Sequence, residues 1–490
     1  MKIALQKTRT SHSITNEEAT RLCQTALEQK DREDYAGAQE TMRRLWPGLG
    51  ERPKTEGWHP SVAAEVLLCA GILTGWIGSK IQNSEAQETA KNLITESIEY
   101  SESIGDQKTV AGAQAELAYC YWRSGEPNEA RTMLREALNK LTPGTTKARA
   151  FLKLTTVEWT AGRYYEALET LTANASLFQR LTNHAVRGAY HSEHAIVLRN
   201  LATAENTQEF FQRAIDEYRL ADKQFRLAKN PIFRADVKNN VGFLFYKLER
   251  FKEAYKYLDE ARRLTIRFKD KARTAQIDET RAQVLIAEGK YKEAEYVARK
   301  AAVALGKSGH QRLVACALIT QGTALARLDR REHAQLIFQR AIEVGVRVEA
   351  LSAAGLAALT MIEEIDQLSP EILQAAYQQA REWLASAQSP DLLRRLNEAA
   401  GKVVAGMQAS LTTEDAMTAL SSKPHGLEDS VLKYEKALIR QALVQANGSI
   451  THAASLLGTS YQALAYMIQA RHKDLLKVRS PVRSRGKKNP

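Results

Sequence analysis

The sequence predicts an all-α protein in which a long array of antiparallel helix pairs is followed by a small helical domain. Its 490 residues include only 11 Pro and 26 Gly, which favours long helices over sheets. Small residues recur along the middle of the chain at alternating intervals of 12 and 7. Near the C-terminus, two short apolar patterns with helical spacing are separated by one Gly-containing turn.

Composition limits the compartment and the class of protein. Hydrophobic residues make up 44% of the chain, and the four cysteines are scattered without metal-ligand spacing. They predict small core residues in a reducing compartment, so we expect a cytoplasmic protein. The N-terminus has no apolar run of signal-peptide length. The longest apolar stretch, 62–78, contains Glu65 and favours a buried helix over a membrane span.

The regular spacing of small residues defines the predicted helix pairs. Two helices that pack closely need small residues where their backbones approach and large residues between those points. The predicted turns fall at SGEPNE, LERFKE, AEGKYKE and LDRREH. The small residues are Ala118, Ala130 and Ala137, then Gly242, Ala254 and Ala261, then Ala282, Ala294 and Ala301, then Gly322, Ala334 and Ala341.

This pattern resembles the tetratricopeptide (TPR) repeat, most clearly in NNVGFLFYKLERFKEAYKYLDEARRL. The central alanines Ala254, Ala294 and Ala334 recur at a longer interval than the roughly 34 residues of an ordinary TPR. We therefore expect longer helices, as in the TPR sensor domains of several bacterial regulators. Weaker units bring the predicted TPR-like α-solenoid to eight or nine pairs, and they lie at 62–104, 151–174, 184–228 and 350–385.

The TPR resemblance implies a superhelix whose inner wall is lined by the first helix of each pair. Residues on the inner face of those helices are candidates for a groove that binds an extended peptide or a protein partner. An Asn in such a groove can both donate to and accept from a peptide backbone. The alternative is that the aromatic residues only pack between neighbouring repeats. The candidates are Tyr119, Trp122, Thr156, Trp159, Asn239, Phe243, Tyr246, Glu279 and Gln283.

The stretch from Ser449 to His472 has the form of a helix-turn-helix that reads the DNA major groove. Gly458 is expected to end the first helix in the left-handed conformation, and Thr459 or Ser460 can cap the second. Apolar residues expected to face the core of this domain are Ile450, Ala453, Ala454, Leu457, Leu464 and Ile468. A preceding helix, 429–446, is expected to pack on the pair through Val431, Leu432, Leu438, Ile439, Ala442 and Leu443.

The run EKALIRQALVQANGSITHAASLLGTSYQAL resembles the Fis-type DNA-binding domain found at the C-terminus of many bacterial enhancer-binding regulators. The Asn447-Gly448 join and the Ala453-Ala454 pair are its most specific parts. Fis-type recognition helices commonly carry Arg or Lys where this chain has Ala465, Tyr466 and Met467. Such regulators usually place an ATPase module before the domain, but no Gly-rich phosphate loop is found here.

Charge supports binding to DNA. Residues 430–490 contain eleven Lys or Arg and two acidic residues, a net charge of +9 out of +12 for the whole chain. A protein that binds a polyanion is expected to carry such a footprint. We predict a TPR-like array at 1–385, a helical connector and linker at 386–426, a helix-turn-helix domain at 427–476, and a disordered basic tail at 477–490.

Candidate DNA contacts follow from the start of the second helix and its flanks. Gln can pair with adenine through two hydrogen bonds, and Ala can touch a thymine methyl group. The candidates for reading bases are Ser460, Tyr461, Gln462, Ala463 and Tyr466. The candidates for holding phosphates are Thr459, Arg471, His472 and Lys473, together with the tail.

We therefore expect a bacterial, nucleoid-associated transcriptional regulator that binds double-stranded DNA as a homodimer under control of its array. The alternative is a TPR scaffold whose basic C-terminus binds nucleic acid without sequence preference, and RNA binding by the tail is a third possibility. No catalytic set or cofactor motif is found, so we expect neither catalysis nor a cofactor. His184, His191 and His194 share a helical face, but we expect a surface cluster there rather than a metal site.

Overall fold

The computed structural model describes residues 14–81, 83, 85–205, 207–385, 390–419, 427–446 and 448–478. Within these residues every regular element is a helix, which confirms the all-α prediction. The chain divides into two compact units, Met1–Gly406 and Met407–Pro490. The predicted tail from 479 onward, the SSKPHG linker and Asn447 lie outside the described residues.

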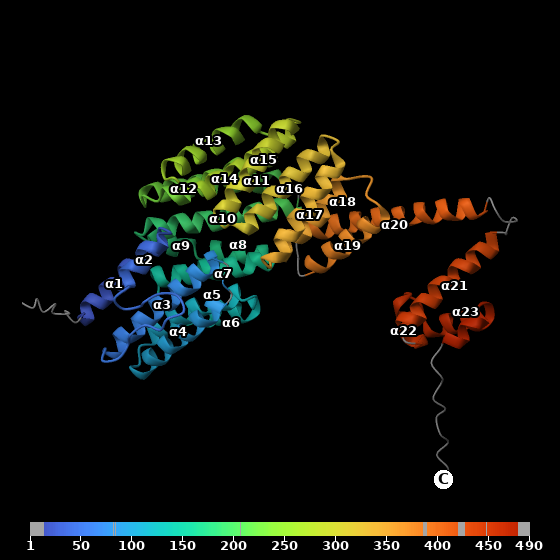
Figure 1. Cartoon of the computed structure of the whole chain (residues 1–490). Coiled ribbons are helices and arrows are strands. Elements are labelled where there is room, and N and C mark those ends of the chain that lie inside the picture. Colours follow the sequence, from blue (N-terminus) through green and yellow to red (C-terminus); the bar gives the residue numbers. More distant parts are fainter. Residues whose placement is uncertain are drawn as a thin grey trace, which may run out of the picture. The chain divides into compact units, whose positions relative to one another are not determined.

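The first unit contains nine antiparallel helix pairs among its described residues, at the upper end of the predicted number. Figure 1 shows them side by side, from the blue N-terminal helices to the orange α19. A short helix, α9 (Ala175–Arg180), follows the fourth pair. The pairs are α1 (Asn16–Asp31) with α2 (Tyr35–Met42), α3 (Pro60–Ile81) with α4 (Glu85–Ser103), α5 (Gln107–Arg123) with α6 (Pro127–Lys140), α7 (Thr145–Thr160) with α8 (Tyr164–Ala173), α10 (His184–Glu205) with α11 (Gln208–Leu227), α12 (Pro231–Lys247) with α13 (Phe251–Arg267), α14 (Lys271–Ala287) with α15 (Tyr291–Lys307), α16 (Gln311–Arg327) with α17 (Arg331–Arg347), and α18 (Leu351–Glu364) with α19 (Pro370–Trp383).

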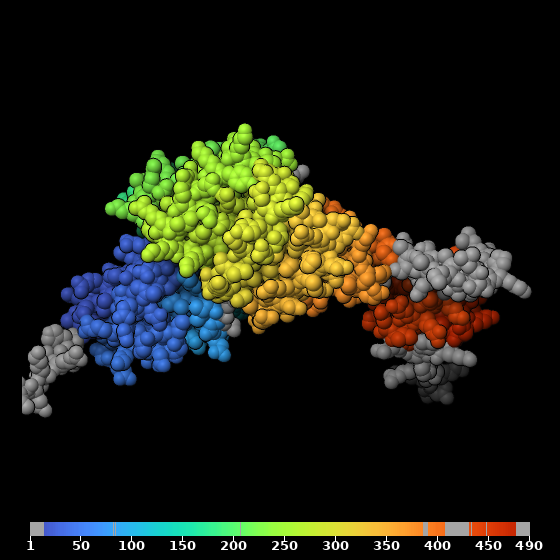
Figure 2. Space-filling view, turned by 45° about the horizontal axis from the view of Figure 1, so that its top comes forward, coloured from blue at the N-terminus to red at the C-terminus, as the bar shows by residue number. Residues whose placement is uncertain are grey.

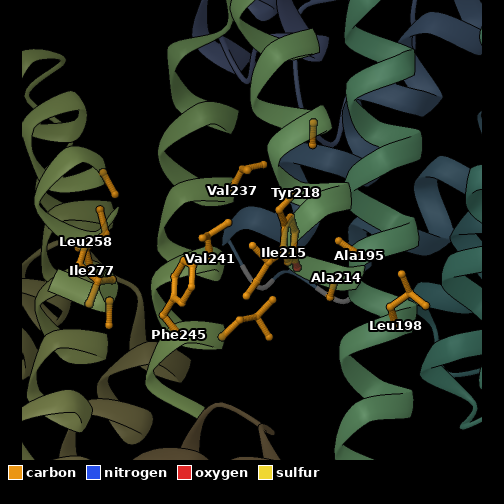
Figure 3. Close-up of a cluster of buried hydrophobic side chains, with 14 of the residues drawn as sticks. Ala195, Leu198, Ala214, Ile215, Tyr218, Val237, Val241, Phe245, Leu258 and Ile277 are labelled. Carbon is orange, nitrogen blue, oxygen red and sulfur yellow. The ribbon is translucent and has the colours of Figure 1, made fainter. Parts of the chain in front are cut away.

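The periodic small residues lie where the helices of each pair approach most closely, as predicted. All ten alanines of the pattern are almost completely buried. A Cβ added to Gly322 would lie 2.9 Å from the ring of Phe338, so α16 packs on α17 at a distance that excludes even a methyl group. Large side chains fill the space between these contacts, and Figure 3 shows one such cluster in which Tyr218, Val241 and Phe245 meet between neighbouring helices.

The apolar helix α3 is long and apolar enough to cross a membrane by composition alone. However, 78% of its most apolar window is buried inside the protein. Its core partners include Cys23, Met42 and Trp46 from the first helix pair and the turn that follows it. These contacts support the prediction that the stretch 62–78 is a buried helix.

Helix α20 (Pro390–Ala419) begins inside the first unit, although its sequence suggests a connector. Ala399 is buried in the last apolar cluster of the array, where Leu396 packs beside it. Arg395 donates two hydrogen bonds to the carboxylate of Glu363 on α18, at 2.8 and 2.7 Å. The start of the predicted connector therefore closes the end of the array.

The second unit contains α21 (Leu427–Gln445), α22 (Ile450–Leu456), α23 (Tyr461–Arg471) and a 3-10 helix (Lys473–Val478). Its small core contains eight of the twelve apolar residues predicted to face inward, and Leu457 packs beside them partly buried. The prediction is wrong at three positions of α21, because Val431, Leu432 and Leu438 are 54%, 37% and 40% exposed. Val431 and Leu432 precede Glu435, which contacts His472, whereas Leu438 is exposed although it adjoins the buried Ile439.

Candidate functional site

The helix-turn-helix of the second unit is shaped by caps that the sequence predicts. Gly458 has a φ of +63°, a left-handed conformation that few other residues adopt without strain. Ser460 is the N-cap of α23, and its hydroxyl oxygen accepts a hydrogen bond from the backbone amide of Ala463 at 3.1 Å. These two residues fix the sharp turn from α22 into α23.

The outer face of α23 is exposed, polar and uncharged. Tyr461 and Tyr466 are 51% and 67% exposed, and Gln462 lies between them on the same face. Leu464 and Ile468 on the opposite face are fully buried, as predicted. Phenol hydroxyls and carboxamides can both donate and accept hydrogen bonds, so this face can match the edges of bases without a net charge of its own.

Basic side chains lie at the edges of this face. Arg471 and Lys473 at the end of α23 are exposed, and Arg471 forms an ion pair with Glu435 at 3.2 Å. Lys436 forms an ion pair with Asp474 at 2.8 Å, and its hydrogen bond holds the pKa of that carboxyl below its usual value. Exposed pairs of this kind are weak and can exchange their carboxylate for a phosphate.

His472, which the sequence suggests as a phosphate ligand, lies elsewhere. It is only 3% exposed, and its Nε2 atom lies 3.0 Å from Glu435 on α21. It therefore positions Glu435 inside the domain and is unavailable to DNA. Thr459 is half-buried in the turn, whereas Ala463 is exposed. Because His472 and Glu435 are 37 residues apart, no local pattern in the sequence reveals their contact.

In the first unit, three neighbouring cavities lie along the inner side of the array. The largest has a volume of about 1130 Å³ and is lined by Trp122 and Asn239, among others. A second, of about 290 Å³, is lined by Thr156, and Tyr119 lines both. A third, of about 370 Å³, is lined by Glu279 and Gln283. The structure thus brings six of the nine predicted groove residues to the walls of these cavities.

The other three predicted groove residues make contacts within the wall. Trp159 donates its indole N–H to Glu193 at 2.8 Å. Phe243 and Tyr246 meet edge to face with ring centroids 5.7 Å apart, and the ammonium of Lys247 lies over both rings. For these residues the alternative interpretation, packing within the array, describes the contacts better.

An aromatic and cationic cluster lines the 1130 Å³ cavity, and two of its members, Trp76 and Tyr119, also line the 290 Å³ cavity. The rings of Trp76, Tyr119 and Trp122 follow one another at centroid distances of 5.9 and 4.8 Å. The guanidinium of Arg123 lies over Trp76 and Tyr119, at 4.1 and 4.6 Å. The sequence did not predict Trp76 or Arg123 as groove residues. Trp76 lies in the weaker unit 62–104, where the TPR pattern is too irregular to show which side of the helix faces the groove, and Arg123 is recognised only by its contact with Trp76.

The inner wall also contains buried charges, and most of them are paired. Lys153 and Glu116 form an ion pair at 2.6 Å, and both lie in the wall of the 290 Å³ cavity. Glu193 in the same wall has no such cation partner among the described residues. Burial raises its pKa to about 7, although the hydrogen bond from Trp159 opposes this shift.

The three histidines considered as a metal site form hydrogen bonds and close contacts between α10 and α11. His191 and His194 both approach Glu217, at 2.7 and 3.3 Å, and His184 bonds to Gln224 at 2.9 Å. Burial would raise the pKa of Glu217, but the bonds from His191 and His194 outweigh it and lower that pKa to about 2. The histidines are thus largely buried between helices rather than on the surface.

Comparison with known proteins identifies the C-terminal domain. Residues 432–470 match the family described as bacterial regulatory protein, Fis family. No curated protein sequence matches the chain. Among solved structures, the chain is similar to a signal transduction ATPase with numerous domains from Pyrococcus horikoshii that has a tetratricopeptide repeat sensor, with 13% identity and a TM-score of 0.48. This match covers 75% of the chain but only 55% of that protein, so the chain spans little more than half of its length.

The chain is also similar to two further solved structures. A Rap protein complexed with competence and sporulation factor is 12% identical, with a TM-score of 0.46, and the match covers 69% of the chain and 99% of that protein. Aspartyl phosphate phosphatase F from Bacillus subtilis is 14% identical, with a TM-score of 0.39, and the match covers 76% and 96%. At these identities the likenesses concern the fold alone.

A Fis-type helix-turn-helix domain follows a long array of TPR-like helix pairs in this chain. The Fis-type match lies at residues 432–470, and the helix pairs lie within Met1–Gly406.

Proposed function

We propose that the array senses a partner or ligand in its inner cavities and thereby controls how the Fis-type domain binds double-stranded DNA. The observation that carries this proposal is the uncovered face of α23, where Tyr461, Gln462 and Tyr466 are exposed at the N-terminal end of a helix that follows a tight turn. In the Fis-type match, this helix corresponds to the element that enters the major groove.

In the proposed complex, sequence is read by hydrogen bonds and packing from an uncharged helix. Gln462 forms two hydrogen bonds with an adenine, and Tyr461 and Tyr466 contact neighbouring bases or sugars. Arg471 and Lys473 contact phosphates, and the basic residues beyond 478 add further phosphate contacts. Phosphate contacts then set the register, and α23 provides the specificity.

We also propose that the protein binds DNA as a homodimer, because one helix-turn-helix reads only a short half-site. An apolar stripe on the first half of α21 supports this proposal. Val431, Tyr434 and Leu438 recur at helical spacing and are 54%, 59% and 40% exposed. Pairing of two such stripes would remove them from water. In a dimer that reads two half-sites, the two recognition helices are expected about 34 Å apart, one turn of DNA.

We propose that the protein acts by binding rather than by catalysis, in the compartment that contains the chromosome. Both parts assigned above are binding modules, and the cavity walls are dominated by aromatic rings and paired charges. Its partner in the array is proposed to be a peptide or a protein segment, because the cavities follow one another along the inner wall as an extended chain would.

Genomic immunoprecipitation of the full-length protein tests the proposal, followed by affinity measurements on a recovered fragment and on bulk DNA. We expect the fragment to compete successfully against bulk DNA of equal mass. Substitution Gln462→Ala should weaken binding to the fragment by roughly 5- to 150-fold, the loss of one good bidentate base contact, and leave binding to bulk DNA unchanged.

Gln445→Ala is the matched control, because Gln445 is an exposed residue at the end of α21 and away from α23. If the recovered fragment shows no advantage over bulk DNA, the alternative of a scaffold with a non-specific basic end is favoured. If Gln462→Ala weakens both DNAs equally, α23 does not read the sequence.

A further inference from the structure

The turn between α1 and α2 reaches into the interior of the array and is held there by distant basic residues. Arg149 of α7 binds the carboxylate of Asp31 through two hydrogen bonds, one of them 3.1 Å long. Arg273 of α14 forms an ion pair with Glu33, which lies 240 positions earlier in the chain. Figure 2 shows the blue N-terminal part of the array lying against its green and yellow part. Two carboxylates of one turn thus connect helix pairs that are far apart in sequence.

The same turn lies between the 1130 Å³ and the 290 Å³ cavities. Glu33 and Tyr35 line both the 1130 Å³ and the 290 Å³ cavities, and so do Trp76 and Tyr119 opposite them. Tyr35 is fixed from the other side by the ammonium of Lys80, 4.9 Å from its ring. If the turn moved away, the two cavities would become one continuous groove.

The pair of Asp31 and Arg149 is the stronger of the two contacts. Bidentate arginine–carboxylate pairs combine charge with a fixed geometry. Burial would raise the pKa of Asp31, but Lys30 and Arg149 outweigh that effect and hold it below its usual value. Arg149 forms no other ion pair among the described residues, so withdrawing Asp31 would leave a partly buried guanidinium with only the more distant charge of Glu116 to stabilise it.

Three carboxylates surround Arg273, although one is enough to balance the charge of a guanidinium group. Besides Glu33 it contacts Asp236 at 3.0 Å and Asp270 at 2.9 Å. The contact with Glu33 can therefore be exchanged without leaving Arg273 unpaired. If the turn left, Arg149 would lose its carboxylate partner. Arg273 would lose one of its three carboxylates and could bind another in its place.

We propose that the α1–α2 turn is a resident occupant of the array's interior, and that the array's partner is an acidic peptide segment. Two carboxylates of that segment, two residues apart like Asp31 and Glu33, replace them on Arg149 and Arg273. This inference rests on the proposed function, because it assumes that the array binds a partner, and it names the chemistry of that partner. Binding would displace the turn and join the two cavities.

The test uses the full-length protein and a synthetic peptide with the sequence of residues 29–38, QKDREDYAGA, blocked at both ends and fluorescently labelled. A second peptide has Asn and Gln in place of the Asp and Glu that correspond to Asp31 and Glu33. The protein variant D31N/E33Q removes the resident charges and keeps the size of the side chains. Glu249→Gln is the matched control, because Glu249 occupies the left-handed turn position of α12–α13, with a φ of +56°, as Glu33 does in α1–α2 with +61°.

We expect the acidic peptide to bind D31N/E33Q at least tenfold more tightly than the wild type or Glu249→Gln, and adding Arg149→Gln should abolish that gain. The neutral peptide should bind none of them measurably. Equal affinity of the acidic peptide for wild type and D31N/E33Q, or equal affinity of the two peptides for D31N/E33Q, would overturn the inference.

Hydrogen exchange in the wild type gives a second measurement that does not depend on the variants. Saturating acidic peptide should speed amide exchange at residues 32–35 while the helices of the array stay protected. Unchanged exchange there would also contradict the inference. DNA binding is measured separately, so its failure would count against the proposed function and not against the occupancy of the array.

Discussion

The inner wall of the array and the outer face of α23 both serve recognition, but they use charge in opposite ways. On the inner wall, carboxylates and guanidinium groups such as Asp31 and Arg149 are enclosed and already paired. On α23, the reading face is uncharged and its cations lie at the edges, exposed to water. A partner of the array must therefore exchange one ion pair for another, whereas DNA is attracted over a distance by cations that are exposed to water.

This contrast predicts very different responses to salt, which is the largest effect we expect. If each subunit makes about five phosphate contacts, the logarithm of the DNA affinity falls with the logarithm of the salt concentration at a slope of about −4.5. Raising salt from about 50 to 200 mM would then weaken DNA binding by roughly 500-fold. Fluorescence anisotropy with a labelled duplex measures this slope.

The acidic peptide on D31N/E33Q is the reference for the same salt series. Enclosed ion pairs are screened less than exposed ones, so its affinity should fall by less than about tenfold. A DNA affinity that does not change with salt would remove the electrostatic basis of the proposed interface. Equal slopes for DNA and peptide would show that the two regions do not differ in the way described.

A second prediction concerns Glu193, whose carboxyl lies in the wall of the array without an ion pair. Its pKa of about 7 exceeds the ordinary value of 4.5, so the folded state holds its proton more tightly than the unfolded state. Below pH 4.5 both states are protonated and its effect on stability is absent. Between pH 4.5 and 7 the unfolded state ionises first, and the unfolding free energy falls by roughly 3 kcal/mol.

Substitution Glu193→Gln should remove this decline, because an amide does not ionise and still accepts the hydrogen bond from Trp159. Urea denaturation followed by circular dichroism at pH 4.5 and pH 8 measures the effect. The variant should match the wild type at pH 4.5 and exceed it at pH 8. The ionisation of Glu217, with a pKa of about 2, affects stability only below this range. Glu249→Gln, at an exposed turn position, should leave the pH profile of the wild type unchanged.

The sequence predicts well those features that are set by short-range periodicity. The buried small residues, the cap at Gly458 and the inward Leu464 all follow from spacing along one or two helices. Contacts between distant repeats cannot be predicted from such spacing. The ion pair of Asp31 with Arg149 spans 118 positions, and it depends on the small rotations between successive pairs that bring the superhelix back on itself.

The same limit explains the errors in the C-terminal domain. Helical spacing alone assigns Val431, Leu432 and Leu438 to the core, but spacing cannot show which part of α21 the rest of the domain covers. It likewise gives no reason for His472 to turn inward toward Glu435. Apolar periodicity identifies the apolar face of a helix. Only the three-dimensional structure shows whether other helices of the domain bury that face.

The smallest effect we predict tests the close packing that positions the inner wall. Gly322→Ala places a methyl group 2.9 Å from the ring of Phe338, which must shift, and should lower the unfolding free energy of the array by about 1–3 kcal/mol. Gly401→Ala in α20 is the matched control, because a Cβ there meets no atom within 4 Å. It should stabilise by about 0.5–1 kcal/mol, since Ala has less freedom in the unfolded chain. Urea denaturation of both variants gives the comparison, and equal changes would mean that α16 and α17 are not packed as tightly as their glycine contact requires.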